Sequence, residues 1–187
     1  MTKNSDKPLV VGLAGFGTVG GGLVRLLEEN ADLIRRRSGR DILIRKVLVR
    51  NAKKARSVPL PEGAELTTNP RDLTDDPQID VLVELMGGID HARDLIDRAL
   101  DQGKHIVTAN KALLAKYGPE IYSAAEAKGV DIYFEAAVGG AIPFLRPLRE
   151  SLVGDKVTSM LGIVNGTTNY ILDEMTTKGL QFDDVLK

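Results

Sequence analysis

The sequence has no cysteine and no tryptophan, and it holds only two histidines among 187 residues. Without cysteine, the chain has no disulfide, no thiol nucleophile and no thiolate metal site. His91 and His105 stand far apart and in no metal-ligand spacing, which disfavours a zinc site built on imidazoles. No apolar run is long enough to cross a membrane. These absences leave a glycine-rich globular protein that handles a small molecule.

An excess of charge of one sign is also lacking, because 25 lysines and arginines face 26 aspartates and glutamates. This balance disfavours a nucleic-acid binder, since phosphate recognition normally leaves a basic excess. The segment from Met1 to Pro8 is polar and too short for the apolar part of a secretory signal. We therefore expect a cytoplasmic protein with no nucleic-acid or membrane partner.

Apolar runs of strand length alternate with segments of helical periodicity up to residue 138. This alternation predicts an α/β fold with a doubly wound parallel sheet. The predicted strands are 9–14, 41–49, a brief edge strand at 66–68, 79–86, 105–109 and 130–137. The predicted helices are one from the glycines after the first strand to Ser38, then 89–100 and 112–127.

The pattern changes at the break Gly139-Gly140-Ala141-Ile142-Pro143. Beyond it we expect a helix over 144–152, a strand over 156–164 and a helix over 170–177. The sequence therefore predicts one domain over residues 1–142 and the start of a second over residues 143–187.

The glycines Gly15, Gly17 and Gly20 follow a buried strand and open a helix. In that context the pattern Gly-x-Gly-x-x-Gly permits a tight turn, close approach of the backbone to a pyrophosphate, and close packing of helix on strand. It predicts a dinucleotide site formed by residues 15–20. The alternative is a glycine turn that serves only the fold.

The second predicted strand ends in Val49-Arg50-Asn51 and is followed by Lys53 and Lys54. A carboxylate is usual at that place in NAD sites, whereas a cationic cluster suits the 2′-phosphate of NADP. The sequence therefore favours NADP(H), with NAD(H) as the alternative. A solvated basic loop with no ligand is the other interpretation.

Two further strand ends carry candidate residues. Gly87 and Gly88 provide small residues against which a nicotinamide ribose could pack. Lys111 directly follows an apolar strand, where its ammonium could hydrogen-bond a substrate oxygen or a ribose hydroxyl. The alternative for Lys111 is an ion pair with a carboxylate at the sheet edge.

The segment from Glu135 to Ile142 allows two interpretations. Its glycines could turn backbone carbonyls inward and, with the Glu135 carboxylate, form an oxygen cage for a hard cation. A hinge between domains explains the same glycines, and the residues alone favour the hinge.

Four motifs in order and spacing closely resemble the homoserine dehydrogenase family: Gly15-Phe16-Gly17-Thr18-Val19-Gly20, Val107-Thr108-Ala109-Asn110-Lys111, Glu135-Ala136-Ala137-Val138-Gly139-Gly140-Ala141-Ile142-Pro143 and Asn165-Gly166-Thr167-Thr168-Asn169-Tyr170-Ile171-Leu172. The resemblance implies a Rossmann-type domain followed by the beginning of an α+β catalytic and dimerisation domain. It implies reduction of aspartate semialdehyde to homoserine with NAD(P)H, on the route to threonine, methionine and isoleucine. It also implies a homodimer through the second domain.

The resemblance assigns roles to individual residues. Phe16, Thr18 and Val19 would lie along the cofactor, Arg50 would lie near the adenosine ribose and its phosphate, and Lys111 would reach toward nicotinamide and substrate. Sodium would be held by Glu135 and the carbonyls of Val138, Gly140 and Ile142, while Gly166 and Thr167 would face the substrate.

In the family, the lysine that donates the proton and its partner aspartate follow the point where this sequence stops. The resemblance therefore implies that this chain alone lacks part of the site and is inactive. Two alternatives remain: an NADP-binding sensor or regulatory module without turnover, and a dehydrogenase for another semialdehyde or small acid.

Overall fold

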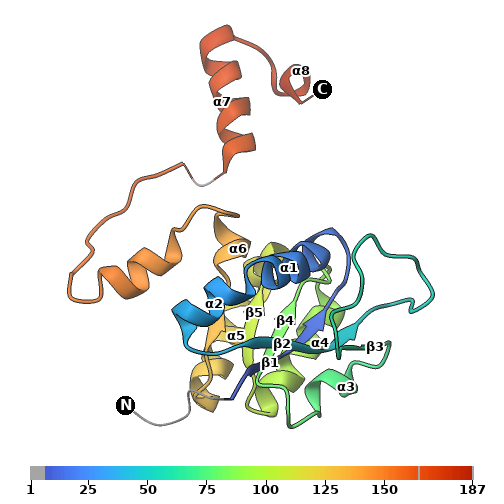
Figure 1. The fold of residues 1–187 in the computed structure, drawn as a ribbon. Helices are drawn as coiled ribbons and strands as arrows, with labels where there is room; N and C mark the ends of the chain where they lie inside the picture. Colours follow the sequence, from blue (N-terminus) through green and yellow to red (C-terminus); the bar gives the residue numbers. More distant parts are fainter. Residues whose placement is uncertain (1–6, 164, 187) are drawn as a thin grey trace. The chain divides into compact units, whose positions relative to one another are not determined.

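A computed structural model describes residues 7–163 and 165–186 of the chain (Figure 1). Residues 1–6, most of the polar segment considered above, lie outside the described residues, as do Val164 and Lys187. The chain divides into two compact units, with the division between Ala137 and Val138.

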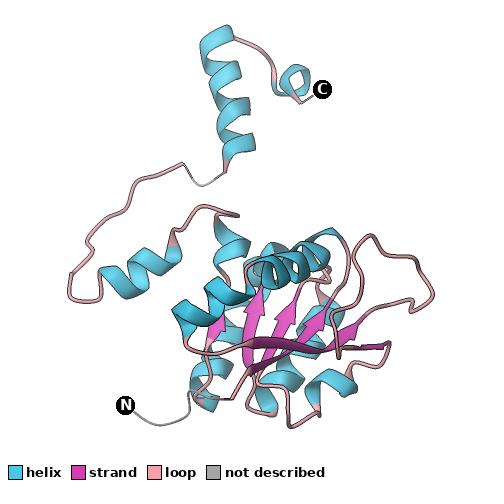
Figure 2. Cartoon of the chain, in the orientation of Figure 1, coloured by secondary structure: helices cyan, strands magenta, loops and turns pink. Residues whose placement is uncertain are grey.

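A parallel sheet forms the middle of the first unit, in the strand order β3-β2-β1-β4-β5-β6. Figure 2 shows its strands as arrows. Every strand pair is parallel, and the order reverses between β1 and β4, which confirms the doubly wound architecture. The strands are β1 (Leu9–Ala14), β2 (Ile42–Leu48), β3 (Glu65–Thr67), β4 (Val81–Glu84), β5 (His105–Thr108) and β6 (Ile132–Tyr133).

Helices cover both faces of this sheet (Figure 1). One face packs against α1 (Thr18–Glu29), and the other against α3 (Arg71–Thr74), α4 (Asp90–Asp101) and α5 (Lys111–Lys128). α2 (Ala31–Ser38) follows α1 directly. The single helix predicted here is wrong, because Asn30 leaves helical geometry and its side-chain amide donates to the carbonyl of Leu26 at 3.0 Å.

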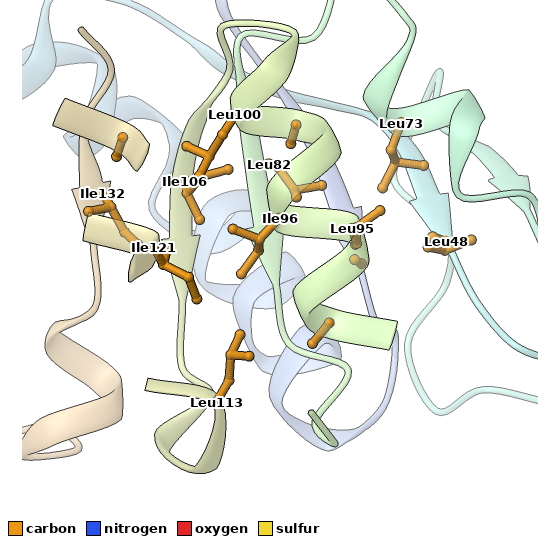
Figure 3. Close-up of a cluster of buried hydrophobic side chains, with 14 of the residues drawn as sticks. Leu48, Leu73, Leu82, Leu95, Ile96, Leu100, Ile106, Leu113, Ile121 and Ile132 are labelled. Carbon is orange, nitrogen blue, oxygen red and sulfur yellow. The ribbon is translucent and has the colours of Figure 1, made fainter. Parts of the chain in front are cut away.

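Alternate residues of the strands enter two separate cores. In β4, Leu82 enters the core beneath α4 and α5, whereas Val81 and Val83 enter the core beneath α1. Figure 3 shows the first of these cores, where side chains from α3, α4 and α5 meet those of the strands. Burial on both faces explains why these strands appear in the sequence as continuous apolar runs.

The last predicted strand of the first unit is mostly wrong. β6 has only two residues, Ile132 and Tyr133, and α6 (Glu135–Val138) follows in place of the strand expected to reach Ala137. In the described sheet β6 lies at the edge beside β5, and Tyr133 is exposed. Ala136 and Ala137 are strong helix formers, so the residues after Phe134 form α6 instead of continuing the strand.

The second unit contains a π-helical turn at Pro147–Ser151, α7 (Gly166–Lys178) and α8 (Phe182–Val185). The turn and α7 lie where the sequence predicts helices. The strand predicted over 156–164 is wrong for residues 156–163, which form no strand and are all exposed; Val164 lies outside the described residues. A strand needs a neighbour for its backbone hydrogen bonds, and this segment has none among the described residues. Within the described ranges, no helix is long and apolar enough to span a membrane.

Asp76 joins the segment before β4 to β2. Its carboxylate lies 2.9 Å from Arg45 Nε and 3.2 Å from Lys46 Nζ, and it accepts a hydrogen bond from the amide of Gln78. Burial raises the pKa of Asp76, but the Gln78 hydrogen bond and the two cations outweigh burial and lower this pKa from 3.8 to about 2. At the amino end of β5, Lys104 Nζ donates to the carbonyl of Asp76.

We expect Asp76→Asn to destabilise the chain by about 2 kcal/mol near neutral pH and far less near about pH 2. The folded pKa lies below the unfolded one, so the stabilisation is complete above about pH 4 and is lost as the pH falls toward 2. Urea unfolding at several pH values measures the difference. Asp94→Asn, at an exposed position on α4, should keep the wild-type pH dependence. An equal loss for Asp76→Asn at every pH would contradict the assignment.

Candidate functional site

The turn from β1 into α1 lies against the loop that follows β4. Gly15 has a φ of +103°, and a Cβ on it would lie 2.6 Å from the carbonyl oxygen of Leu85. A Cβ on Gly20 would overlap the carbonyl oxygen of Gly15. Gly17 differs, because a Cβ there would meet no atom of the described residues within 4 Å. The fold itself requires Gly15 and Gly20, whereas Gly17 leaves open space beside the backbone.

The amino end of α1 is the second component of the site. Gly17 occupies the N-cap position, and no side chain caps the helix there. Thr18 and Val19 are exposed in the first turn. The first amides of a helix have no partner within the helix and carry the positive end of its dipole, so this end suits an anion.

The basic loop after β2 folds around Arg56. The guanidinium of Arg56 donates to the carbonyls of Asn51 at 2.7 Å and Lys54 at 2.6 Å, and it lies 5.9 Å from the centre of the Phe16 ring. Arg50, Lys53 and Lys54 have exposed side chains. Arg56 therefore connects the loop to the glycine turn, while the other cations face solvent. Arg56 is not among the site residues predicted from the sequence.

Behind the loop that follows β4 lies Glu84, a fully buried carboxylate. Its Oε1 accepts hydrogen bonds from the amides of Met86 at 2.8 Å and Gly87 at 3.2 Å. Its Oε2 accepts the hydroxyl hydrogen of Thr108 at 2.6 Å. Gly87 is thus held at the carboxyl edge of the sheet, where the sequence predicts the nicotinamide ribose.

Lys111 is the first residue of α5 and is exposed. Just before it, Asn110 caps the helix: its side-chain oxygen accepts from Leu113 N at 3.1 Å, and its amide donates to Gly88 O at 2.6 Å. No ion pair of Lys111 is found among the described residues, so the structure does not support the carboxylate partner considered above. The Lys111 amine remains available to a ligand.

The segment proposed for the cation spans the division between the two units. Glu135 belongs to the first unit, where it begins α6, whereas Val138, Gly140 and Ile142 belong to the second unit. Gly140 has a φ of +62°, and the amide of Ile142 donates to the carbonyl of Gly139 at 3.1 Å. The carbonyl that accepts this hydrogen bond is that of Gly139, which is not one of the proposed ligands. An all-oxygen set with one carboxylate suits a hard cation, so the donor chemistry fits.

Gly166 and Thr167 belong to the second unit, where they begin α7. Asn165 caps this helix, because its side-chain oxygen accepts from Thr168 N at 2.8 Å. The motif Asn165-Gly166-Thr167-Thr168 is therefore a helix start in this structure. The role of Gly166 and Thr167 toward a substrate stays a prediction.

The first unit brings the predicted residues of the glycine turn, the basic loop, the β4 loop and α5 to the carboxyl ends of adjacent strands. Glu84 and Thr108, which support this edge of the sheet, are not among the site residues predicted from the sequence. The signal for Glu84 was an acidic residue ending the buried run Val81–Glu84, since a buried carboxylate needs hydrogen-bond partners. The signal for Thr108 was its place in register beside Glu84, which only the strand pairing reveals.

Strand order, the glycine turn and the open helix terminus at the reversal point together define a domain of the Rossmann class. The comparisons with known proteins name the family. Residues 15–135 match the sequence model described as "Homoserine dehydrogenase, NAD binding domain", and residues 143–187 match that described as "Homoserine dehydrogenase". The chain belongs to the homoserine dehydrogenase family.

Individual relatives agree with this result. The chain is 46% identical over 181 residues to the homoserine dehydrogenase of Bacillus subtilis, covering 97% of this chain and 42% of the relative. It is 50% identical over 179 residues to that of Synechocystis, covering 94% and 40%. The crystal structure of a homoserine dehydrogenase from Thiobacillus denitrificans superposes with a TM-score of 0.84 at 54% identity, covering 97% and 42%. The chain thus spans about two fifths of the length of these relatives.

We expect Gly17→Ala to preserve stability within about 0.5 kcal/mol and to weaken dinucleotide binding by about tenfold or more, because the new methyl group occupies only the open space beside the turn. Thermal unfolding and fluorescence titration with NADPH measure the two effects.

Gly22→Ala is the matched control, since Gly22 is exposed on α1 and an added Cβ there meets no described atom within 4 Å. Gly22→Ala should leave affinity unchanged and stabilise the helix slightly. Equal affinity in both variants would contradict a ligand beside Gly17.

Proposed function

We propose that the first unit binds NADP(H) across the carboxyl ends of β1 and β4. The observation that carries this proposal is the open space at Gly17 beside the uncapped start of α1, where a pyrophosphate would fit. The exposed cations Arg50, Lys53 and Lys54 support a 2′-phosphate in place of a hydroxyl. NAD(H) is the competing cofactor.

Replacing Arg50 by Ala should weaken NADPH by about tenfold while changing NADH by less than about twofold, since only NADPH offers the extra phosphate for a charge-assisted hydrogen bond. Fluorescence titration of both dinucleotides gives the ratio. Arg36→Ala, at an exposed position on α2 near the other end of β2, is the control with the same loss of charge. Equal losses for NADPH and NADH in Arg50→Ala would remove the phosphate assignment.

For the intact protein we propose the family reaction, the interconversion of aspartate semialdehyde and homoserine. The bound nicotinamide supplies or accepts the hydride. The chain's own residues hold and orient the reactants: residues 15–20 and Gly87 position the cofactor, and Lys111 hydrogen-bonds a substrate or ribose oxygen from the start of α5. Gly166 and Thr167 face the substrate. The proton donor is proposed to lie in the part of the relatives that this chain does not span.

A sodium ion held by Glu135 and the carbonyls of Val138, Gly140 and Ile142 belongs to the same proposal, and its support is the oxygen-only donor set. Anomalous density beside Glu135 in crystals grown with rubidium would support it, and its absence would count against it. Apolar side chains exposed in the second unit, including Val153, Leu161 and Ile163, are proposed to be covered in the intact homodimer.

The activity is tested by fusing the chain to the remaining residues of the Synechocystis relative. We expect the fusion to oxidise NADPH with aspartate semialdehyde and the present chain to bind NADPH without turnover. Turnover by this chain alone would contradict the proposed location of the proton donor.

Two other outcomes would favour the other function classes. Cofactor binding with no turnover by the fusion would favour a sensor or regulatory module. Turnover of another aldehyde, with none of aspartate semialdehyde, would replace the substrate assignment.

A further inference from the structure

The buried carboxylate of Glu84 is linked to Thr108 by the pairing of their strands. Glu84 ends β4, Thr108 ends β5, and the two residues are register partners in this parallel pair. Their side chains therefore project from the same face of the sheet, where the Thr108 hydroxyl donates to Glu84 Oε2 at 2.6 Å. Both residues are almost completely buried.

The chain of hydrogen bonds continues from both residues. The hydroxyl oxygen of Thr108 accepts a hydrogen bond from the backbone amide of Asn110 at 3.0 Å. The side-chain amide of Asn110 donates to the carbonyl of Gly88 at 2.6 Å. Glu84 in turn accepts from the amides of Met86 and Gly87. The bonds thus close a ring that runs from β4 through the glycine loop to the start of α5 and back through β5.

This ring joins two parts of the candidate site that are distant in sequence. One part is the loop from Met86 to Gly88, which the proposed function places beside the nicotinamide ribose. The other is the first turn of α5, which Asn110 caps and on which Lys111 stands. Gly87 and Gly88 both have positive φ and little backbone restraint of their own, so the ring supplies the restraint.

We propose that Glu84, Thr108 and Asn110 are positioning residues that hold the β4 loop and the start of α5 rigidly against each other. The nicotinamide end of the cofactor and Lys111 then keep a fixed position relative to each other. The proposal rests on the proposed function. Thr108 is the critical member, because its hydroxyl both donates to Glu84 and accepts from Asn110.

Thr108→Val tests the proposal, since it keeps the shape of the side chain and removes both hydrogen bonds. We expect a rise of about tenfold in the dissociation constant for NADPH, measured by fluorescence titration. We also expect amide hydrogen exchange to become about tenfold faster at Met86, Gly87 and Asn110 together. Thr108→Ser keeps the hydroxyl and should restore both values to within about twofold of the wild type.

The matched control is Thr74→Val. Thr74 is fully buried at the end of α3, and its hydroxyl also donates to a carboxylate, that of Asp75, at 2.7 Å. This variant loses the same kind of hydrogen bond in the segment that leads into the amino end of β4. It should lose comparable stability but keep the exchange rates at Met86 and Gly87 and the affinity for NADPH.

The outcomes separate this inference from the function on which it rests. A wild-type chain that binds neither NADPH nor NADH would overturn the proposed function, and the cofactor-positioning role with it. A wild-type chain that binds NADPH, with Thr108→Val indistinguishable from Thr74→Val, would overturn the positioning role alone. Faster exchange at Asn110 without a change at Met86 and Gly87 would also overturn it, because the ring would then not couple the two segments.

Discussion

The close approach of the glycine turn to the loop after β4 is the constraint on which the carboxyl edge of the sheet depends. β1 and β4 are paired in parallel, so the segments that follow them leave the sheet at the same edge. The backbone of Gly15 therefore approaches that of Leu85. No side chain fits between them. The turn must therefore contain glycine, α1 must begin where it does, and the adjoining loop needs support from beneath. Glu84 provides that support with an acceptor for two successive amides.

Charged side chains in the first unit fall into two groups, those paired within the fold and those exposed at the carboxyl ends of the strands. Asp76, Lys46 and Lys104 pair with one another or with nearby backbone carbonyls, and these contacts stabilise the fold. At the carboxyl ends, Arg50 and Lys111 are exposed and make no ion pair among the described residues. Since exposed cations attract anions before contact, the second arrangement suits recognition of a phosphorylated ligand.

Sequence patterns predicted the first unit well because its strands are buried on both faces and its helices have clear ends, such as Gly129 in left-handed geometry after α5. They failed where long-range pairing decides the structure. β6 has only two residues, and residues 156–163 form no strand among the described residues. The break at Asn30 depends on one side-chain hydrogen bond. The ring around Thr108 could not be predicted, since it follows from strand register and not from any local pattern.

The contacts of Arg56 have a thermodynamic consequence for the basic loop. By donating to the carbonyls of Asn51 and Lys54, its guanidinium fixes the course of the backbone before any ligand arrives. A flexible loop would lose conformational entropy on closing around a phosphate, and that loss would subtract from affinity. Because folding has already ordered this backbone, the phosphate binding proposed above would immobilise only the side chains of Arg50, Lys53 and Lys54. The proposed preference for NADP(H) over NAD(H) would then depend on a difference in hydrogen bonding, with no cost of loop ordering to offset it.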